Sequence, residues 1–204
     1  MIFYFSAHRI YLPRRMSLAL LYSLLGVCAI LMILERLGLP TTLQLTFKGD
    51  VKRETRWLAQ YGQAVSALVA AAVIWQLDAN LPRRRAAVID VLTASLGAAI
   101  IGMLIKRLLG RVRPGREHAG RFLGPSWRHA NYRESFPSNH TASAVAMSAV
   151  LAHLYPSAAA TFWSLAIACA LLRYVLDAHW PSDVIAGVIL GYLAATLAVH
   201  WTGL

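Results

Sequence analysis

The sequence predicts an all-α membrane protein: a polytopic bundle of six transmembrane helices with a short-helix and loop segment between the third and fourth. The chain is 58% hydrophobic and only 14% charged, whereas soluble domains are nearer a quarter charged. Its mean hydropathy is +0.53. Apolar runs of about 20 residues, the length that crosses a bilayer, recur six times. The 204 residues fit a single membrane-embedded domain over 1–204.

The predicted spans follow one another with short connections, except for one long segment in the middle. Several are rich in Ala and Gly, whose small side chains let helices approach closely in lipid. The fourth begins with polar residues and ends near His153, so we expect only its central part to contact lipid. The six spans are residues 16–34, 58–77, 86–105, 138–155, 157–176 and 183–201.

The basic composition limits the partners. The net charge is +11, from twenty Lys and Arg against nine Asp and Glu. Because the remaining residues are mostly compatible with lipid, anionic head groups or an anionic substrate are favoured over nucleic acid. The two cysteines, Cys28 and Cys169, both lie inside apolar runs, which argues against a disulfide framework or a cysteine-rich zinc site. We expect no cleavable signal peptide at the N-terminus.

Basic residues in short flanks set the predicted orientation. Arg14 and Arg15 precede the first span and Arg83–Arg85 precede the third, so both groups belong in the cytoplasm if every span crosses. Residues 106–136 are then extracytoplasmic although they contain eight Lys and Arg. Either the orientation is inverted, or these charges attract a phosphate-bearing head group, which we favour. We therefore expect an inner (plasma) membrane protein. In both orientations the end of the third span, the start of the fourth and the fifth-to-sixth loop share one face.

The first motif closes the third span, where Lys106 is followed by Arg107, Arg111 and Arg113-Pro114. Arginine binds phosphate oxygens bidentately, and lysine binds them as a point charge. On its own, this segment is equally typical of side chains that snorkel to the interface.

The second motif, Pro137-Ser138-Asn139-His140-Thr141, opens the fourth span. Ser138 can N-cap that helix, whose free backbone N–H groups and dipole then favour an anion. His140 lies in the first turn, close enough to deliver a proton. Alone, the motif is an ordinary helix start.

The third motif places Arg173, His179 and Asp183 around the fifth-to-sixth connection. If the turn is helical, Asp183 can accept the Nδ1–H of His179 and leave Nε2 free to attack phosphorus. A structural His–Asp pair that caps the sixth span is the alternative. His140, His179 and Asp183 would also suit a metal, but the surrounding arginines would repel a divalent cation, so we expect none.

Taken together, the order, spacing and common face of the motifs are specific. They resemble the three-part signature of the type 2 phosphatidic acid phosphatase superfamily, whose membrane members are six-helix lipid phosphatases. The matching residues are Lys106, Arg113-Pro114, Pro137-Ser138-Asn139-His140, Arg173, His179 and Asp183. This chain departs from the pattern at Asn139, where the family usually has Gly, and at Leu172, where it usually has Ser.

The resemblance implies a role for each residue. His179 would be the nucleophile that forms a phosphohistidine, and Asp183 would orient it. His140 would protonate the leaving alkoxide and later activate water. The remaining residues would hold the phosphate oxygens: Lys106, Arg113, Ser138, Asn139 and Arg173. Neither a metal nor a cofactor is required.

We therefore expect a metal-independent phosphatase that hydrolyses a lipid phosphate or diphosphate at the extracytoplasmic membrane face. The expected partners are a phospholipid or polyprenyl phosphate substrate and the membrane lipids. By resemblance, candidate substrates are phosphatidic acid, phosphatidylglycerol phosphate, undecaprenyl diphosphate and the phosphates of lipid A. Two alternatives stay open: a lipid phosphotransferase that uses the same histidine, and a non-catalytic lipid-phosphate binding or transport protein in which Asn139 disables the chemistry.

Overall fold

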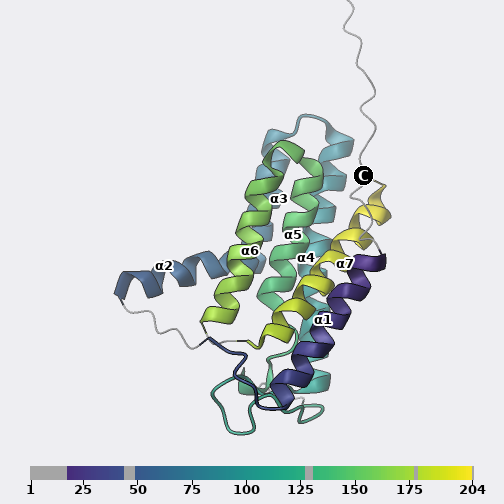
Figure 1. The fold of residues 1–204 in the computed structure, drawn as a ribbon. Helices are drawn as coiled ribbons and strands as arrows, with labels where there is room; N and C mark the ends of the chain where they lie inside the picture. The colour runs from purple at the N-terminus through teal and green to yellow at the C-terminus, as the bar shows by residue number, and fades with distance from the viewer. Residues whose placement is uncertain (1–17, 44–48, 127–130, 177–178, 204) are drawn as a thin grey trace, which may run out of the picture.

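The computed structural model describes residues 18–43, 49–126, 131–176 and 179–203, and the regular elements in these ranges are all helices. Figure 1 shows the long ones side by side in a bundle. They are α1 (Leu18–Arg36), α3 (Ala64–Leu77), α4 (Leu81–Leu109), α5 (Asn139–Leu154), α6 (Ala159–Val175) and α7 (Pro181–Thr202). Most side chains of α5 are buried because it packs against α4, α6 and α7. The all-helical fold class is confirmed.

Four helices of the described chain are long and apolar enough to cross a membrane, namely α1, α4, α6 with the turn before it, and α7. The predicted second span is not one straight helix. Residues 58 and 59 end α2 (Gly49–Ala59), the turn η1 (Gln60–Gly62) follows, and α2 and α3 are bent by 64°. This bent pair would count as a fifth span. Helix α5 has 16 residues, about 24 Å, so the six-span count stays a prediction.

Helix boundaries differ most from the predicted ones at α4. This helix was expected over 86–105 but runs from Leu81 to Leu109. The Asn80 side chain accepts the N–H of Arg83, Pro82 occupies the first turn, and Gly110 ends the helix in the left-handed conformation; all three are typical terminal signals. The arginines at 83–85 therefore belong to the helix instead of a loop. Helices α5, α6 and α7 begin and end within two residues of the predicted spans.

Close packing of α5 against α7 depends on two glycines four residues apart. A Cβ atom added to Gly191 would lie 2.3 Å from the carbonyl oxygen of Ala142, and one on Gly187 would lie 2.7 Å from that of Ser138. Small residues at this spacing allow helix backbones to approach closely in lipid. The contact holds the first turns of α5 and α7 together, so the second and third motifs are fixed relative to each other.

The bend at η1 packs on the start of α5 in a similar way. A Cβ atom on Gly62 would lie 2.0 Å from the carbonyl oxygen of His140. The Cys169 thiol of α6 donates to the carbonyl of Ala59 over 3.4 Å. The broken second span therefore supports His140 from outside.

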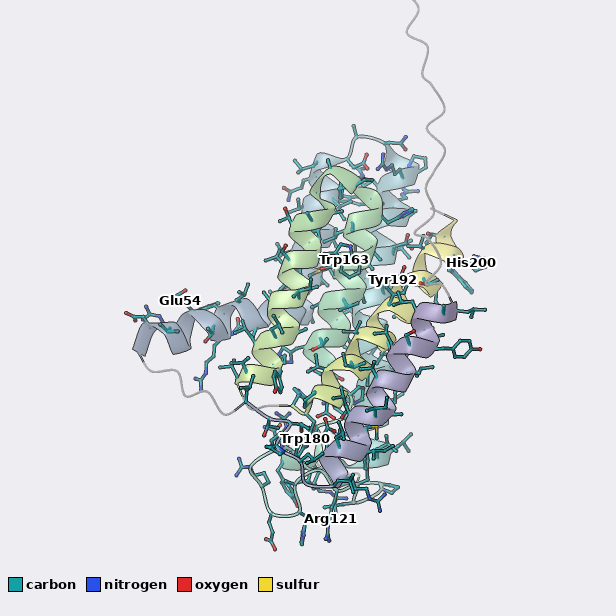
Figure 2. All side chains as sticks on the ribbon, in the orientation of Figure 1. Glu54, Arg121, Trp163, Trp180, Tyr192 and His200 are labelled. Atoms are coloured by element: carbon teal, nitrogen blue, oxygen red, sulfur yellow. The ribbon has the colours of Figure 1, made fainter. Side chains whose placement is uncertain are left out.

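The outward faces of the helices are apolar. Exposed side chains include Leu18, Ile30 and Ile33 of α1 and Leu197 and Trp201 of α7. Large exposed apolar surfaces of this kind fit a lipid environment. Polar atoms gather instead at the end of the bundle near Trp180 (Figure 2).

Gly191→Ala is expected to destabilise the protein, although alanine is normally the better helix residue. The added methyl group overlaps α5, and overpacking of this kind costs about 1–3 kcal/mol. Gly97→Ala in α4 is the matched control, because no atom lies within 4 Å of the position that its Cβ would take and the same change in an open helical position gains about 0.5–1 kcal/mol. Thermal unfolding in detergent measures both. Equal midpoints for the two variants would contradict the close α5–α7 contact.

Candidate active site

The candidate site lies at the end of the bundle where α4 and α6 end and α5 and α7 begin. The C-terminus of α1 and the segment 110–136 meet it there (Figure 1). All three motifs identified in the sequence are brought to this end. Two hydrogen bonds to backbone carbonyls tie them: Ser138 N–H donates to the carbonyl of Asp183 over 2.9 Å, and the Trp180 indole donates to the carbonyl of Val112 over 3.0 Å.

The described parts of the long connection, residues 110–126 and 131–136, fold back on one another. Val112 N–H donates to the carbonyl of Arg121, and Arg113 N–H donates to that of Tyr132, both over 2.9 Å. Ser135 N–H donates to the carbonyl of Arg111 over 3.1 Å. These bonds lay the strand-like segment 111–113 between 121–123 and 132–135. They fix where the arginines of the first motif enter the site.

Asp183 is fully buried and accepts hydrogen bonds from three residues. Its Oδ1 accepts from Nη1 of Arg111 over 2.6 Å. Its Oδ2 accepts the hydroxyl of Ser135 in a short hydrogen bond and the backbone N–H of Trp180 over 2.9 Å. A buried carboxylate is costly unless its oxygens are paired, and here both are. Asp183 is thereby fixed at the first turn of α7.

His179 is held with one ring nitrogen occupied. Its Nδ1 lies 2.8 Å from the carbonyl oxygen of Ser135 and 3.5 Å from Oδ2 of Asp183. A carbonyl oxygen only accepts, so Nδ1 carries the proton and Nε2 has the free lone pair. Burial lowers the pKa of His179 to about 3, with Lys106 and Arg173 adding to the effect and Asp183 opposing it. The histidine is therefore a neutral base with Nε2 available.

Lys106 and Arg173 act electrostatically on this ring, and both of them, with Arg113, act on the second histidine, His140. Lys106 Nζ donates to the carbonyls of Glu134 (2.6 Å) and Ser135 (3.3 Å). Arg113 Nη2 donates to the same Glu134 carbonyl over 3.4 Å. Arg173, at the end of α6, acts electrostatically on Lys106, on Arg113 and on both histidines. Cations so close to one another favour an anion bound between them.

At the start of α5, the side chains of Ser138 and Asn139 bond to neighbouring protein groups. Ser138 occupies the N-cap position, but its hydroxyl makes no capping bond and instead accepts from Thr141 over 3.0 Å. The Asn139 amide donates to the carbonyl of Ala99 in α4 over 3.1 Å. A Cβ atom on Gly102 would lie 2.3 Å from the Asn139 Oδ1. The Asn139 side chain is thus directed toward α4, and a contact with phosphate would come from its backbone N–H.

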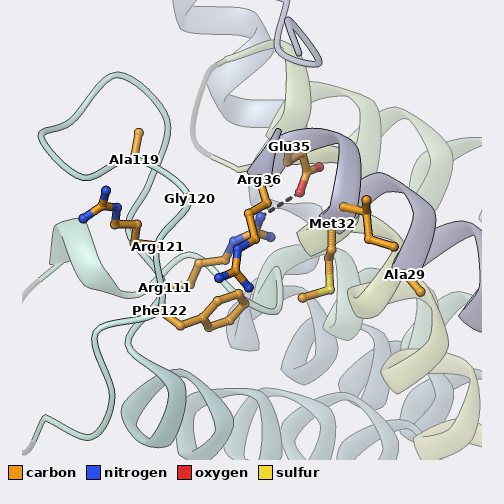
Figure 3. A pocket seen from close by; sticks show the side chains of 10 residues that line it. Ala29, Met32, Glu35, Arg36, Arg111, Ala119, Gly120, Arg121 and Phe122 are labelled. Carbon is orange, nitrogen blue, oxygen red and sulfur yellow. Dashed lines mark hydrogen bonds and ion pairs between the residues drawn. The ribbon is translucent and has the colours of Figure 1, made fainter. Parts of the chain in front are cut away.

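Three residues of the site were not identified from the sequence. Arg111 lies in the first motif but was treated as one of several interfacial cations; its guanidinium is buried between Asp183 and Glu35, as the dashed line in Figure 3 shows for Glu35. Ser135 supplies a hydroxyl and a carbonyl, and the only signal for it was its position two residues before the second motif. The one feature of the sequence that could have pointed to Glu35 is that an acidic residue directly follows the predicted span 16–34.

The metal-site alternative gains no support from the geometry. Within the described ranges, no group of three His, Cys, Asp or Glu side chains is arranged to hold a metal ion. The oxygens of Asp183 are already occupied by Arg111, Ser135 and Trp180. The site's donor set suits an anion.

Acidification is expected to destabilise the folded protein through His179. Its pKa is about 3 in the fold and about 6.5 in an unfolded chain. Between these values the unfolded state binds more protons, so the free energy of unfolding falls as the pH drops through this window. Unfolding midpoints at about pH 7.5 and about pH 5 should therefore fall less in His179→Gln than in wild type. Equal losses would show that His179 is not the group responsible.

Comparison with known proteins gives the family. The family model described as "PAP2 superfamily" matches residues 87–204, more than half of the chain. Lipid A 1-phosphatase of Rhizobium etli (strain ATCC 51251 / DSM 11541 / JCM 21823 / NBRC 15573 / CFN 42) is 39% identical over 101 residues, which are 48% of this chain and 43% of that protein. Lipid A 1-phosphatase of Rhizobium johnstonii is 38% identical over 96 residues, 46% of this chain and 39% of that protein.

These matches cover less than half the length of either relative. The comparison with solved structures found no match. The region matched by the family model begins in α4 and includes all eight predicted site residues. The chain therefore belongs to the PAP2 superfamily, as the three motifs predicted.

Proposed function

We propose that this protein is a metal-independent lipid phosphatase that works through a phosphohistidine on His179. The observation that carries the proposal is a buried neutral histidine whose Nδ1 is fixed by the Ser135 carbonyl, at the same end of the bundle as three interacting cations and a second histidine. This constellation stands at one end of a bundle whose surface suits lipid. The family, and the two relatives whose names state a lipid A phosphatase, support the same reaction class.

The proposed reaction assigns one role to each of these groups. Nε2 of His179 attacks phosphorus, and the bond between phosphorus and the leaving oxygen breaks. His140, in its protonated form, gives its proton to that oxygen. Water then attacks the phosphohistidine, His140 takes a proton from it, and phosphate leaves with His179 restored. Lys106, Arg113 and Arg173 stabilise the charge on the phosphoryl oxygens.

Asp183 acts on the ring that carries the phosphoryl group. Phosphorylation of Nε2 while Nδ1 keeps its proton leaves the imidazole positively charged. The carboxylate, 3.5 Å from Nδ1, stabilises that charge at a buried position where water cannot. The short bond from Ser135 and the backbone N–H of Trp180 hold its Oδ2 at this place, and Arg111 pairs with its Oδ1.

We place the site at the extracytoplasmic face of the inner membrane. The arginines at 83–85 lie in the first turns of α4, and Lys106 lies in its last turn, so the two groups are at opposite ends of one predicted span. The positive-inside rule puts residues 83–85 in the cytoplasm. The excess of cations at the other end is accounted for by the anion that they bind.

A polar cavity favours substrates with a large head group. It has a volume of about 350 Å³ and is lined by Arg113, Pro114, Gly115, Arg116, Asn131 and Tyr132. Arg113 thus faces both this cavity and the cluster that would hold the scissile phosphate. Guanidinium, amide and phenol groups suit the hydroxyls and charges of a phosphorylated sugar. The cavity therefore supports a glycolipid phosphate, the substrate class in the names of the two relatives, over a lipid with a small head group.

Purified protein in detergent should release phosphate from at least one of phosphatidic acid, undecaprenyl diphosphate and lipid A in the presence of EDTA. His179→Ala should abolish release, because no nucleophile remains. His200→Ala is the matched control, since His200 is exposed at the other end of α7 (Figure 2). Rapid alkaline quenching with radiolabelled lipid should trap phosphohistidine in the wild type alone. Release that EDTA abolishes, or that survives His179→Ala, would refute the mechanism.

Arg116→Ala should raise KM for lipid A by about three- to tenfold, the effect of losing one partly exposed charge-assisted hydrogen bond. KM for phosphatidic acid should not change, because its phosphate is attached directly to diacylglycerol and carries no sugar to occupy this cavity. Arg56→Ala, which removes an exposed arginine from α2, controls for the loss of general attraction to anionic lipid. Parallel increases for both substrates in Arg116→Ala would contradict the head-group assignment.

A further inference from the structure

The C-terminus of α1 contributes a carboxylate to the site from outside the region that matches the family. Glu35 lies in the last turn of α1, and its side chain is fully buried. Its Oε2 accepts from Nη2 of Arg111 over 2.6 Å and from the hydroxyl of Ser182 over 2.5 Å. Its Oε1 accepts the backbone N–H of Ser182 over 3.0 Å. The family match begins only at residue 87.

Arg111 is divided between two carboxylates. Nη2 binds Glu35, whereas Nη1 binds Asp183 and the Ser182 hydroxyl, each over 2.6 Å. The guanidinium lies 5.2 Å from the ring centroid of Phe122 and 5.5 Å from that of Trp180. The two rings lie beside the guanidinium, and its two terminal nitrogens each pair with one carboxylate. Figure 3 shows Glu35, Arg111 and Phe122 at this place.

The charge of this trio determines what Asp183 can do. Glu35 and Asp183 carry two negative charges against one positive charge on Arg111, so the buried group is net negative by one. Without the charge of Glu35, Arg111 and Asp183 would form a neutral pair. A neutral pair would stabilise a positively charged phosphohistidine ring far less, because charges act strongly at a buried position.

We propose that Glu35 is a positioning residue for the reaction at His179. It holds Arg111 between the two carboxylates, and its charge leaves the trio of Glu35, Arg111 and Asp183 with one excess negative charge near His179. The inference rests on the proposed phosphatase function. It assigns the first helix a part in catalysis, although that helix provides no group that touches the substrate.

Two variants separate the electrostatic role from a packing role. Glu35→Gln keeps the size of the side chain but removes its charge. It should lower kcat about ten- to a hundredfold, the range for one hydrogen bond to a charged group, and leave KM within about twofold. The double variant Glu35→Gln with Arg111→Met removes one negative and one positive charge, so the trio again has a net charge of minus one, carried by Asp183. Its kcat should therefore exceed that of Glu35→Gln.

A purely structural role for Glu35 predicts the opposite order, because loss of both partners would damage the site more than loss of one. The assay is phosphate release from lipid A and phosphatidic acid by the full chain, for samples with matched size-exclusion profiles. If Arg111→Met prevents folding, Glu35→Asp takes its place. It retains the charge and should recover part of the kcat that Glu35→Gln loses.

The outcomes are distinct. A Glu35→Gln enzyme with wild-type kcat, or a folded double variant no better than Glu35→Gln, overturns this inference and leaves the proposed function intact. A Glu35→Asp enzyme as slow as Glu35→Gln overturns it as well. A wild-type protein that releases no phosphate from these two lipids or from undecaprenyl diphosphate overturns the proposed function and this inference together.

Discussion

The burial of Asp183 at the first turn of α7 is the constraint on which the site depends. A carboxylate shielded from water requires donors, and this one takes them from the 110–136 segment and from the turn before α7. Arg111, drawn in to pair with it, is itself buried and requires a second anion, which α1 supplies through Glu35. One buried charge thus organises two loops and the end of a distant helix. The cost of leaving any partner unpaired makes the arrangement specific.

The cations of the site donate hydrogen bonds to backbone carbonyls. Lys106 and Arg113 are held by backbone carbonyls, chiefly that of Glu134, and act on each other as like charges. A backbone carbonyl orients a cation through its dipole, and the Glu134 and Asp183 carboxylates act on both cations as well. A phosphate dianion would relieve the repulsion among these groups. The site therefore combines a carboxylate 3.5 Å from Nδ1 of His179 with cations that act on the same ring.

The sequence predicted the helical class, the membrane setting and the meeting of three motifs at one end, because these depend on run length, composition and parity. Arg111 could not be told from neighbouring arginines, since charge alone does not reveal which cation turns inward. Glu35 lies 148 residues before Asp183 along the chain, and only the packing of α1 on α7 brings them together. The contact between His179 and Ser135 uses a backbone carbonyl, which every residue type has, so no residue pattern could predict it. The bend between α2 and α3 went unrecognised because Gln60–Gly62 is a short break within the largely apolar run 58–77.

The departure from the family pattern at Asn139 has a local explanation. A glycine at this position would let phosphate approach the backbone, and an amide side chain directed at the site would obstruct that approach. Here the amide instead bonds to Ala99 of α4, in a space that exists because residue 102 is glycine. The side chain is accommodated in the α4–α5 interface, and the backbone N–H groups at the start of α5 remain free to meet an anion. Asn139 therefore gives no reason to expect an inactive site, and this weakens the non-catalytic binding alternative.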